Sequence, residues 1–91
     1  MTFDDERQLA TNALEVLRLA RSVDGAKALT AIKKLAALVA EELEEQPERA
    51  SAWLAVCRVR KTLSENPSSP ELAIHFDAAS DLTKEWLAAI K

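Results

Sequence analysis

The side chains in this sequence that are best suited to chemistry are one cysteine, one histidine and a group of glutamates. Cys57 and His75 would form a nucleophile–base pair if the segments that carry them packed together. Cys57, however, lies in an apolar stretch that includes Trp53, and this setting predicts a buried structural thiol. His75 lies between Ile74 and Phe76, and we interpret it as an imidazole at the surface or boundary of a helix.

A group of glutamates near the middle of the chain is the second candidate for chemistry: Glu41, Glu42, Glu44, Glu45 and Glu48. Paired carboxylates perform general acid–base work only where a cleft gives them unequal environments. These glutamates lie where a helix is expected to end beside a turn, so water should reach them. We interpret them as solvated surface, with binding of a basic partner as the alternative.

The low counts of histidine, cysteine and glycine exclude several kinds of site. One histidine and one cysteine provide too few ligands for a clustered-histidine or CxxC zinc site. One glycine provides no glycine-rich loop that could cradle a phosphate. We therefore predict no catalytic, cofactor-binding or metal-binding residues, no cofactor and no enzymatic activity.

Length and composition predict a single helical domain that spans residues 1–91. The chain has 91 residues, which is the size of one domain, and 48% of them are hydrophobic. Alanine occurs 17 times and leucine 13 times, whereas tyrosine is absent and glycine occurs once. This mixture favours helix over strand throughout the chain.

Net charge and cysteine content bear on where the protein works and what it binds. A formal net charge of -3 excludes a basic field over the whole surface but leaves room for a local basic patch. One cysteine cannot form an intrachain disulfide, which predicts a reducing, cytoplasmic setting. The acidic N-terminus does not resemble a signal peptide, and no apolar run approaches the ~20 residues of a membrane span. We therefore expect a soluble, cytoplasmic protein with no membrane partner.

Hydrophobic spacing predicts two helices in the first half of the chain. The first runs from about residue 3 to 23, with Thr2 as its N-cap and Gly25 as the left-handed residue that follows its end. The second runs from about residue 26 to 46. Its apolar residues repeat at 3-4-3-4 spacing, as in a coiled-coil seam: Leu29, Ile32, Ala36, Val39 and Leu43.

Two further helices are expected in the second half. Pro47 stands where a helix can begin but not continue, so the third helix is expected over about 47–65. The stretch 66–70 contains two prolines and is expected to be a loop, with Ser69 as the cap of the last helix. A fresh cap at Ser80 could split that last helix into two.

The first, third and last helices also carry apolar stripes at helical spacing, which predict the faces that are buried. The stripe of the first helix is Leu9, Ala13, Val16, Leu17 and Ala20. That of the third helix is Ala52, Val56, Val59 and Leu63, and that of the last is Leu72, Phe76, Ala79, Thr83, Trp86 and Ile90.

The fold class that follows is all-α. We predict a small bundle of four helices, or five if the last one is split, because short connections favour antiparallel neighbours. The first three helices would form an antiparallel up-down-up core with the C-terminal helix packed on it. The second helix is apolar over such a wide arc that we expect it to contact two neighbours, or one neighbour and another subunit.

Basic side chains define the candidate partner-binding surface. Antiparallel packing of the first three helices would bring the acidic N-terminus towards the glutamate group and gather basic residues at the middle and the opposite end. Such a charge dipole can arise by chance, and its functional interpretation is a docking surface for an acidic helix, a phosphate backbone or a second copy. The residues predicted to bind a partner are Arg58, Arg60, Lys61, Lys33 and Lys34.

The start of the third segment resembles a junction between tetratricopeptide repeats. Pro47 and Trp53 match the proline of that repeat and the tryptophan of its first helix. Cys57 and Arg60 depart from the small and aromatic residues of the repeat, and no period of about 34 residues is visible. The resemblance implies a helix–turn–helix.

The stretch 28–63 is similar to the helical core of small terminase subunits from phages of actinobacteria. That family pairs a Leu/Ala-rich helix with a helix that carries two arginines and a final leucine. Arg58, Arg60 and Leu63 are the counterparts in this sequence, whereas no basic DNA-binding arm precedes the stretch. The similarity implies ring assembly and association with DNA.

Two functions are consistent with these features. The first is a non-enzymatic helical bundle that acts through protein–protein contacts, either with a copy of itself in a homo-oligomer or with another protein. The alternative is an accessory factor that associates with nucleic acid through its basic residues, as a small-terminase-like subunit of phage DNA packaging would. The breadth of the apolar arc on the second helix favours the first.

Overall fold

The computed structural model describes the backbone of residues 3–40 and 46–90 and the side chains of residues 5–40 and 46–90. Within these ranges the chain folds into helices without any strand, so the prediction of an all-α bundle is confirmed. The helices are α1 (Phe3–Ala20), α2 (Gly25–Val39), α3 (Pro47–Glu65) and α4 (Leu72–Ala89). The predicted N-cap Thr2 and seam residue Leu43 lie outside the described residues.

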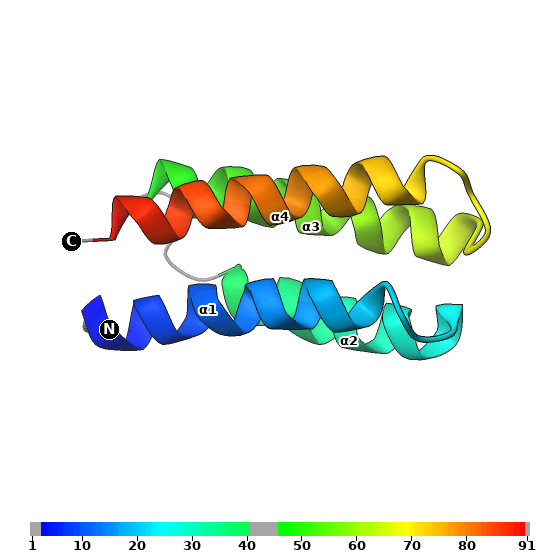
Figure 1. Ribbon diagram of the computed structural model, residues 1–91, viewed down its shortest axis with the longest axis horizontal. Helices are drawn as coiled ribbons and strands as arrows, with labels where there is room; N and C mark the ends of the chain where they lie inside the picture. Colours follow the sequence, from blue (N-terminus) through cyan, green and yellow to red (C-terminus); the bar gives the residue numbers. More distant parts are fainter. Residues whose placement is uncertain (1–2, 41–45, 91) are drawn as a thin grey trace.

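The four helices form a ring in which each packs chiefly against two others (Figure 1). Both α1 and α3 contact α2 and α4; the α3–α4 pair packs most extensively and the α1–α2 pair least. In Figure 1 the start of α1 and the end of α4 lie at one end of the bundle, and the α1–α2 and α3–α4 connections lie at the other. The C-terminal helix therefore lies alongside both α1 and α3.

The core is built from the apolar stripes that the sequence spacing predicts. In α2, Ile32, Ala36 and Val39 are almost completely buried, and Leu29 packs against the core from its edge. Many of the other buried residues are alanines, which allow the helices to approach closely. Most of the predicted stripes of α3 and α4 is buried as well: Ala52, Val56, Val59, Leu63, Phe76, Ala79, Thr83 and Trp86. Leu72 and Ile90, at the two ends of the α4 stripe, are half-buried.

The turn between α1 and α2 differs from the expectation at Gly25. α1 ends at Ala20, and Asp24 is the N-cap of α2, where its carboxylate accepts a hydrogen bond from the Lys27 backbone N–H at 3.0 Å. Gly25 is the first residue of α2, so its prediction as a left-handed residue after α1 is wrong. The reason is that an Asp side chain satisfies the free N–H groups at a helix start, so Asp24 begins a helix. A Cβ at Gly25 would lie 2.7 Å from the Cβ of Pro67, and this close approach explains the glycine.

Hydrogen bonds from side chains to the backbone stabilise the connection between α3 and α4. Ser69 Oγ accepts a hydrogen bond from the Glu71 N–H at 3.2 Å, and Asn66 Oδ1 accepts one from the Ser68 N–H at 3.1 Å. These two bonds stabilise the turn that leads into α4.

The N-cap of α4 is Glu71, whose side chain makes no capping hydrogen bond, so the prediction of Ser69 as the cap is wrong. The reason is that the residues after Ser69 still form a turn, and α4 begins only at Leu72. α4 is one continuous helix from Leu72 to Ala89, so it is not split at Ser80, where the sequence offered a second N-cap.

One buried charge joins all four helices. Arg49, in the first turn of α3, is fully buried, and its Nη1 lies 3.6 Å from Oε1 of Glu6 in α1. At the C-terminus of α2, the carbonyl of Val39 accepts from Arg49 Nε at 3.0 Å and that of Leu38 accepts from Nη2 at 3.3 Å. From α4, Trp86 Nε1 donates to Glu6 Oε1 at 3.0 Å, and its ring lies 5.4 Å from the guanidinium carbon.

Glu6 and Arg49 are buried charges that the sequence pattern does not predict. The acidic N-terminus was expected to lie near the glutamate group at one end of the bundle, and its Glu6 is only 7% exposed. A buried charge is tolerated where an opposite charge and hydrogen bonds replace water. Within the described residues, every buried polar side-chain atom has a hydrogen-bond partner, so the two charges are accommodated without an orphaned group.

Replacing Gly25 with Ala should destabilise the fold by about 1–3 kcal/mol, because the added methyl group would overlap the ring of Pro67. Urea unfolding followed by circular dichroism gives the free energy of unfolding. As a control, the same change in a Pro67→Gly background should cost little, since the overlapping atoms are gone. An equal cost in both backgrounds would contradict the role of this contact.

Replacing Arg49 with Ala should lower the free energy of unfolding by about 3–5 kcal/mol, because it leaves the buried Glu6 carboxylate without its guanidinium. The double replacement of Glu6 by Gln and Arg49 by Met should cost less than Arg49→Ala, because it removes both charges and retains volume. Urea unfolding monitored by tryptophan fluorescence measures both variants. A single variant that loses less than about 1 kcal/mol would show that the network is not structurally important.

Candidate functional site

Cys57 and His75 have different surroundings in the bundle. Cys57 lies on α3 and lines the groove between α2 and α3, together with Lys33 of α2. His75 lies on α4, where Glu71 stands one turn before it, with Nε2 of the imidazole 4.0 Å from Oε2 of that carboxylate. The charged neighbour that the structure gives the imidazole is therefore a carboxylate.

The groove between α2 and α3 brings most of the predicted partner-binding cations together. Its lining cations are Lys33, Arg58, Arg60 and Lys61. The groove has a volume of 480 Å³, and Leu54 and Cys57 supply its apolar part. Cys57 is half-buried here rather than fully buried as expected. The remaining predicted cation, Lys34, lies in a different groove, between α1 and α2.

Ion pairs interrupt the predicted basic end of the bundle on α1 and α4. Arg21 Nη2 lies 2.6 Å from Oδ1 of Asp77, and this pair links α1 to α4. Arg18 pairs with Glu15 within α1. The hydrogen bond from the Arg18 guanidinium lowers the pKa of the Glu15 carboxyl below its usual value. Carboxylates therefore alternate with cations along the α1–α4 groove, and the basic character is strongest between α2 and α3.

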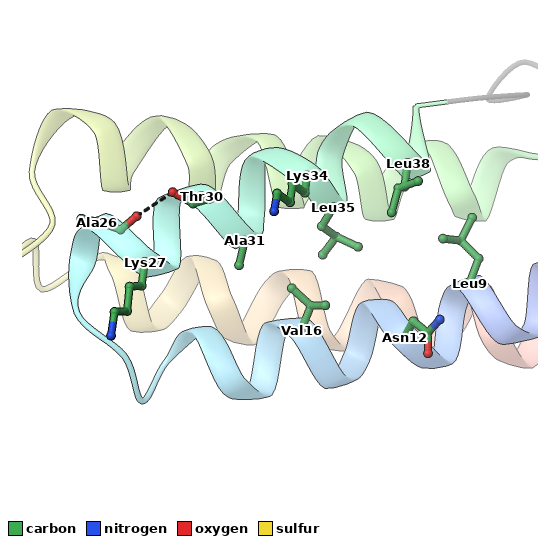
Figure 2. Close-up of a pocket in the computed structure, with 10 residues that line it drawn as sticks. All are labelled: Leu9, Asn12, Val16, Ala26, Lys27, Thr30, Ala31, Lys34, Leu35 and Leu38. Carbon is green, nitrogen blue, oxygen red and sulfur yellow. Dashed lines mark hydrogen bonds between the residues drawn. The ribbon is translucent and has the colours of Figure 1, made fainter.

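The groove between α1 and α2 is the most apolar of the grooves that the described residues line. It has a volume of 630 Å³, and no carboxylate is among the described residues that line it. Figure 2 shows the side chains that α1 and α2 contribute to it. The lining residues are Leu9, Asn12 and Val16 from α1 and Ala26, Lys27, Thr30, Ala31, Lys34, Leu35 and Leu38 from α2.

The residue spacing in α2 creates one wall of this groove. The residues of the wall recur at 4-3-4 intervals and so share one stripe of the helix: Lys27, Ala31, Lys34 and Leu38. Ala31 is small and leaves the middle of the groove open, whereas Leu38 is 60% exposed at one end. Thr30 Oγ1 donates to the Ala26 carbonyl at 3.1 Å, so its hydroxyl hydrogen is used within the helix (Figure 2).

The sequence predicts the wide apolar arc of α2, but it does not predict which residues of α1 form the opposite wall of the groove. Leu9 and Val16 were expected in the core stripe of α1, together with Ala13 and Leu17. In the structure Ala13 and Leu17 are buried, whereas Leu9 and Val16 are half-buried at the edge of that stripe. Leu9 and Val16 are seven residues apart, so they lie on the same edge of the α1 stripe. That shared edge is the signal in the sequence that the two residues line one groove.

Glu48 is the member of the glutamate group that the structure describes. Glu48 is exposed in the first turn of α3, and the other glutamates of the group, at 41–45, lie outside the described residues. Among the residues that the structure describes, no group of His, Cys, Asp and Glu side chains could hold a metal ion. In the same ranges, no helix combines the length and the hydropathy that crossing a membrane requires.

Comparison of the chain with protein-family models, curated proteins and solved structures finds no match. The comparisons therefore give no support to the resemblance to tetratricopeptide repeats or to small terminase subunits. Trp53, on which the first resemblance rests, donates its indole N–H to the Ala36 carbonyl in α2 at 3.1 Å. This bond gives Trp53 a structural role in joining α2 to α3.

Proposed function

We propose that this protein is a non-enzymatic helical bundle that acts through protein–protein contacts in the α1–α2 groove. The observation that carries the proposal is apolar exposure: Leu38 is 60% exposed, and the half-buried Leu9 and Val16 line the same groove. Contiguous apolar surface of this kind marks interaction sites in proteins. A partner that covers the groove would remove this surface from water, at about 25 cal/mol per Å² of apolar area.

The form of the groove suits a helix as the contacting element. Two helices packed side by side in the proposed antiparallel order present a channel between their side-chain ridges, and a third helix can lay its own ridge in that channel. The small side chain of Ala31 leaves space in the middle of the α2 wall. The partner in this proposal is another protein or a second copy of the chain.

A cytoplasmic location is part of the proposal. Cys57 is a free, half-buried thiol, and no second cysteine exists in the chain with which it could form an intrachain disulfide. Thiols persist in reducing compartments, whereas secreted domains of this size often depend on disulfides. A stable fold without a disulfide therefore fits the cytoplasm.

A photoreactive amino acid placed at the exposed Thr30 position should crosslink a partner in cells that naturally contain the protein, because Thr30 lines the groove. Adding Leu38→Glu should reduce the yield of crosslinked product at least about tenfold, since it puts a charge into the apolar contact. Ile74→Glu is the matched control, because Ile74 is 67% exposed on α4 and does not line this groove. No product, or equal yields from the two glutamate variants, would contradict the proposal.

A second candidate function, association with nucleic acid, is supported by the α2–α3 groove. Its clustered cations offer several donors to a phosphate backbone, and such contacts bind without sequence preference. The exposed Leu54 beside them offers an apolar surface to a sugar or a base. A role in phage DNA packaging, like that of a small terminase subunit, would be one form of this function.

Replacing Arg58, Arg60 and Lys61 together with Ala tests the second candidate. If the groove contacts phosphates, the variant should bind a labelled DNA duplex more weakly and with a shallower dependence on salt, because fewer counterions are released. Fluorescence anisotropy at several salt concentrations measures both effects. Replacing Arg7, Arg18 and Lys84 with Ala removes the same charge elsewhere and serves as the control. Absent binding, or binding that the two triple variants alter equally, would exclude this function.

A further inference from the structure

We propose that the occupant of the α1–α2 groove is an acidic amphipathic helix supplied by a different protein. This inference rests on the proposed function. It specifies that the partner is acidic, and it excludes a second copy of the chain as the partner. It follows from three features of the groove. Its lining is largely apolar, two lysines are spaced along one wall, and no carboxylate is among its described lining residues.

The two lysines give the groove a charge pattern with the period of a helix. Lys27 and Lys34 are seven residues apart on α2, which is two helical turns or about 10.5 Å along the axis. A helix that lies along the groove repeats its own side chains at the same interval. Glutamates or aspartates seven residues apart on one edge of that helix would therefore meet both ammonium groups while its apolar stripe contacts Leu35 and Leu38.

Among the described residues, no carboxylate pairs with Lys27 or Lys34. The ion pairs between described residues involve other side chains. On the opposite wall, Asn12 Oδ1 accepts a hydrogen bond from Gln8 Nε2 at 3.1 Å. That bond leaves the amide N–H groups of Asn12 to donate to an acceptor in the groove. Both walls therefore favour an anionic edge on the occupant.

The same charges disfavour a second copy as the occupant. In a twofold dimer the same surface patch contacts itself, so Lys27 and Lys34 of both copies would enter one interface. The described residues of the groove provide no carboxylate to separate these like charges. A partner with acidic residues removes the repulsion and gains attraction, so the groove selects against the chain itself.

Two designed helical peptides with the same leucine and alanine stripe test this inference. One carries Glu and the other Lys at positions spaced by seven beside the stripe, and each has about 18 residues, or about 27 Å of helix. Fluorescence anisotropy with the full chain should show that the acidic peptide binds about tenfold more tightly than the basic one. The double variant Lys27→Glu, Lys34→Glu should reverse this preference.

The matched control is the double variant Lys33→Glu, Lys61→Glu, which changes the net charge equally in the α2–α3 groove and should retain the preference for the acidic peptide. Equal affinity for both peptides, no binding of either, or a preference that both double variants alter equally would overturn the inference. A dimer in sedimentation that Leu38→Glu dissociates would also overturn it in favour of a second copy. The crosslinking from Thr30 with Leu38→Glu, which leaves both lysines in place, then decides separately whether the proposed function stands.

Discussion

Arg49 carries its guanidinium in the interior of the bundle, where no water contacts it. Such a charge costs several kcal/mol to bury unless an opposite charge and hydrogen-bond acceptors replace the lost water. All the replacements described above come from outside α3: the carboxylate of Glu6, two carbonyls at the end of α2 and the indole ring of Trp86. Since each partner belongs to a different helix, their positions along the bundle are fixed relative to Arg49 and to one another.

The arrangement also completes the C-terminus of α2. The last carbonyls of a helix find no backbone N–H within the helix to accept from, so they need donors from elsewhere. Arg49 donates to the carbonyls of Leu38 and Val39. Trp53 adds a second donor to the carbonyl of Ala36, which also accepts from the Ala40 N–H at 3.1 Å. Leu38 therefore has its carbonyl bound to the buried guanidinium while its side chain is exposed in the α1–α2 groove. The exposed apolar end of the groove is held by the core, and a partner would meet a surface that is already ordered.

Three of the grooves that the described residues line thus differ in their chemistry. The α1–α4 groove mixes charges of both signs, the α2–α3 groove is rich in cations, and the α1–α2 groove is apolar with two lysines on one wall. The difference arises because each helix turns a different edge to each neighbour. Lys33 and Lys34 are adjacent in the sequence but about 100° apart around α2, so they line different grooves. A partner-binding surface chosen from the sequence alone would include both lysines.

The sequence by itself determined the helices and most of the core. Pro47 predicted the start of α3 at the residue where it begins, and the spacing of Val56, Val59 and Leu63 predicted which face of that helix is buried. Only the tertiary structure decided that Gly25 approaches Pro67 and that Arg49 is an interior residue. The physical reason is that periodicity relates residues within one helix, whereas these contacts depend on which faces of different helices meet. A buried arginine and a lysine-lined groove have no signature in spacing, because their partners are far apart in the chain.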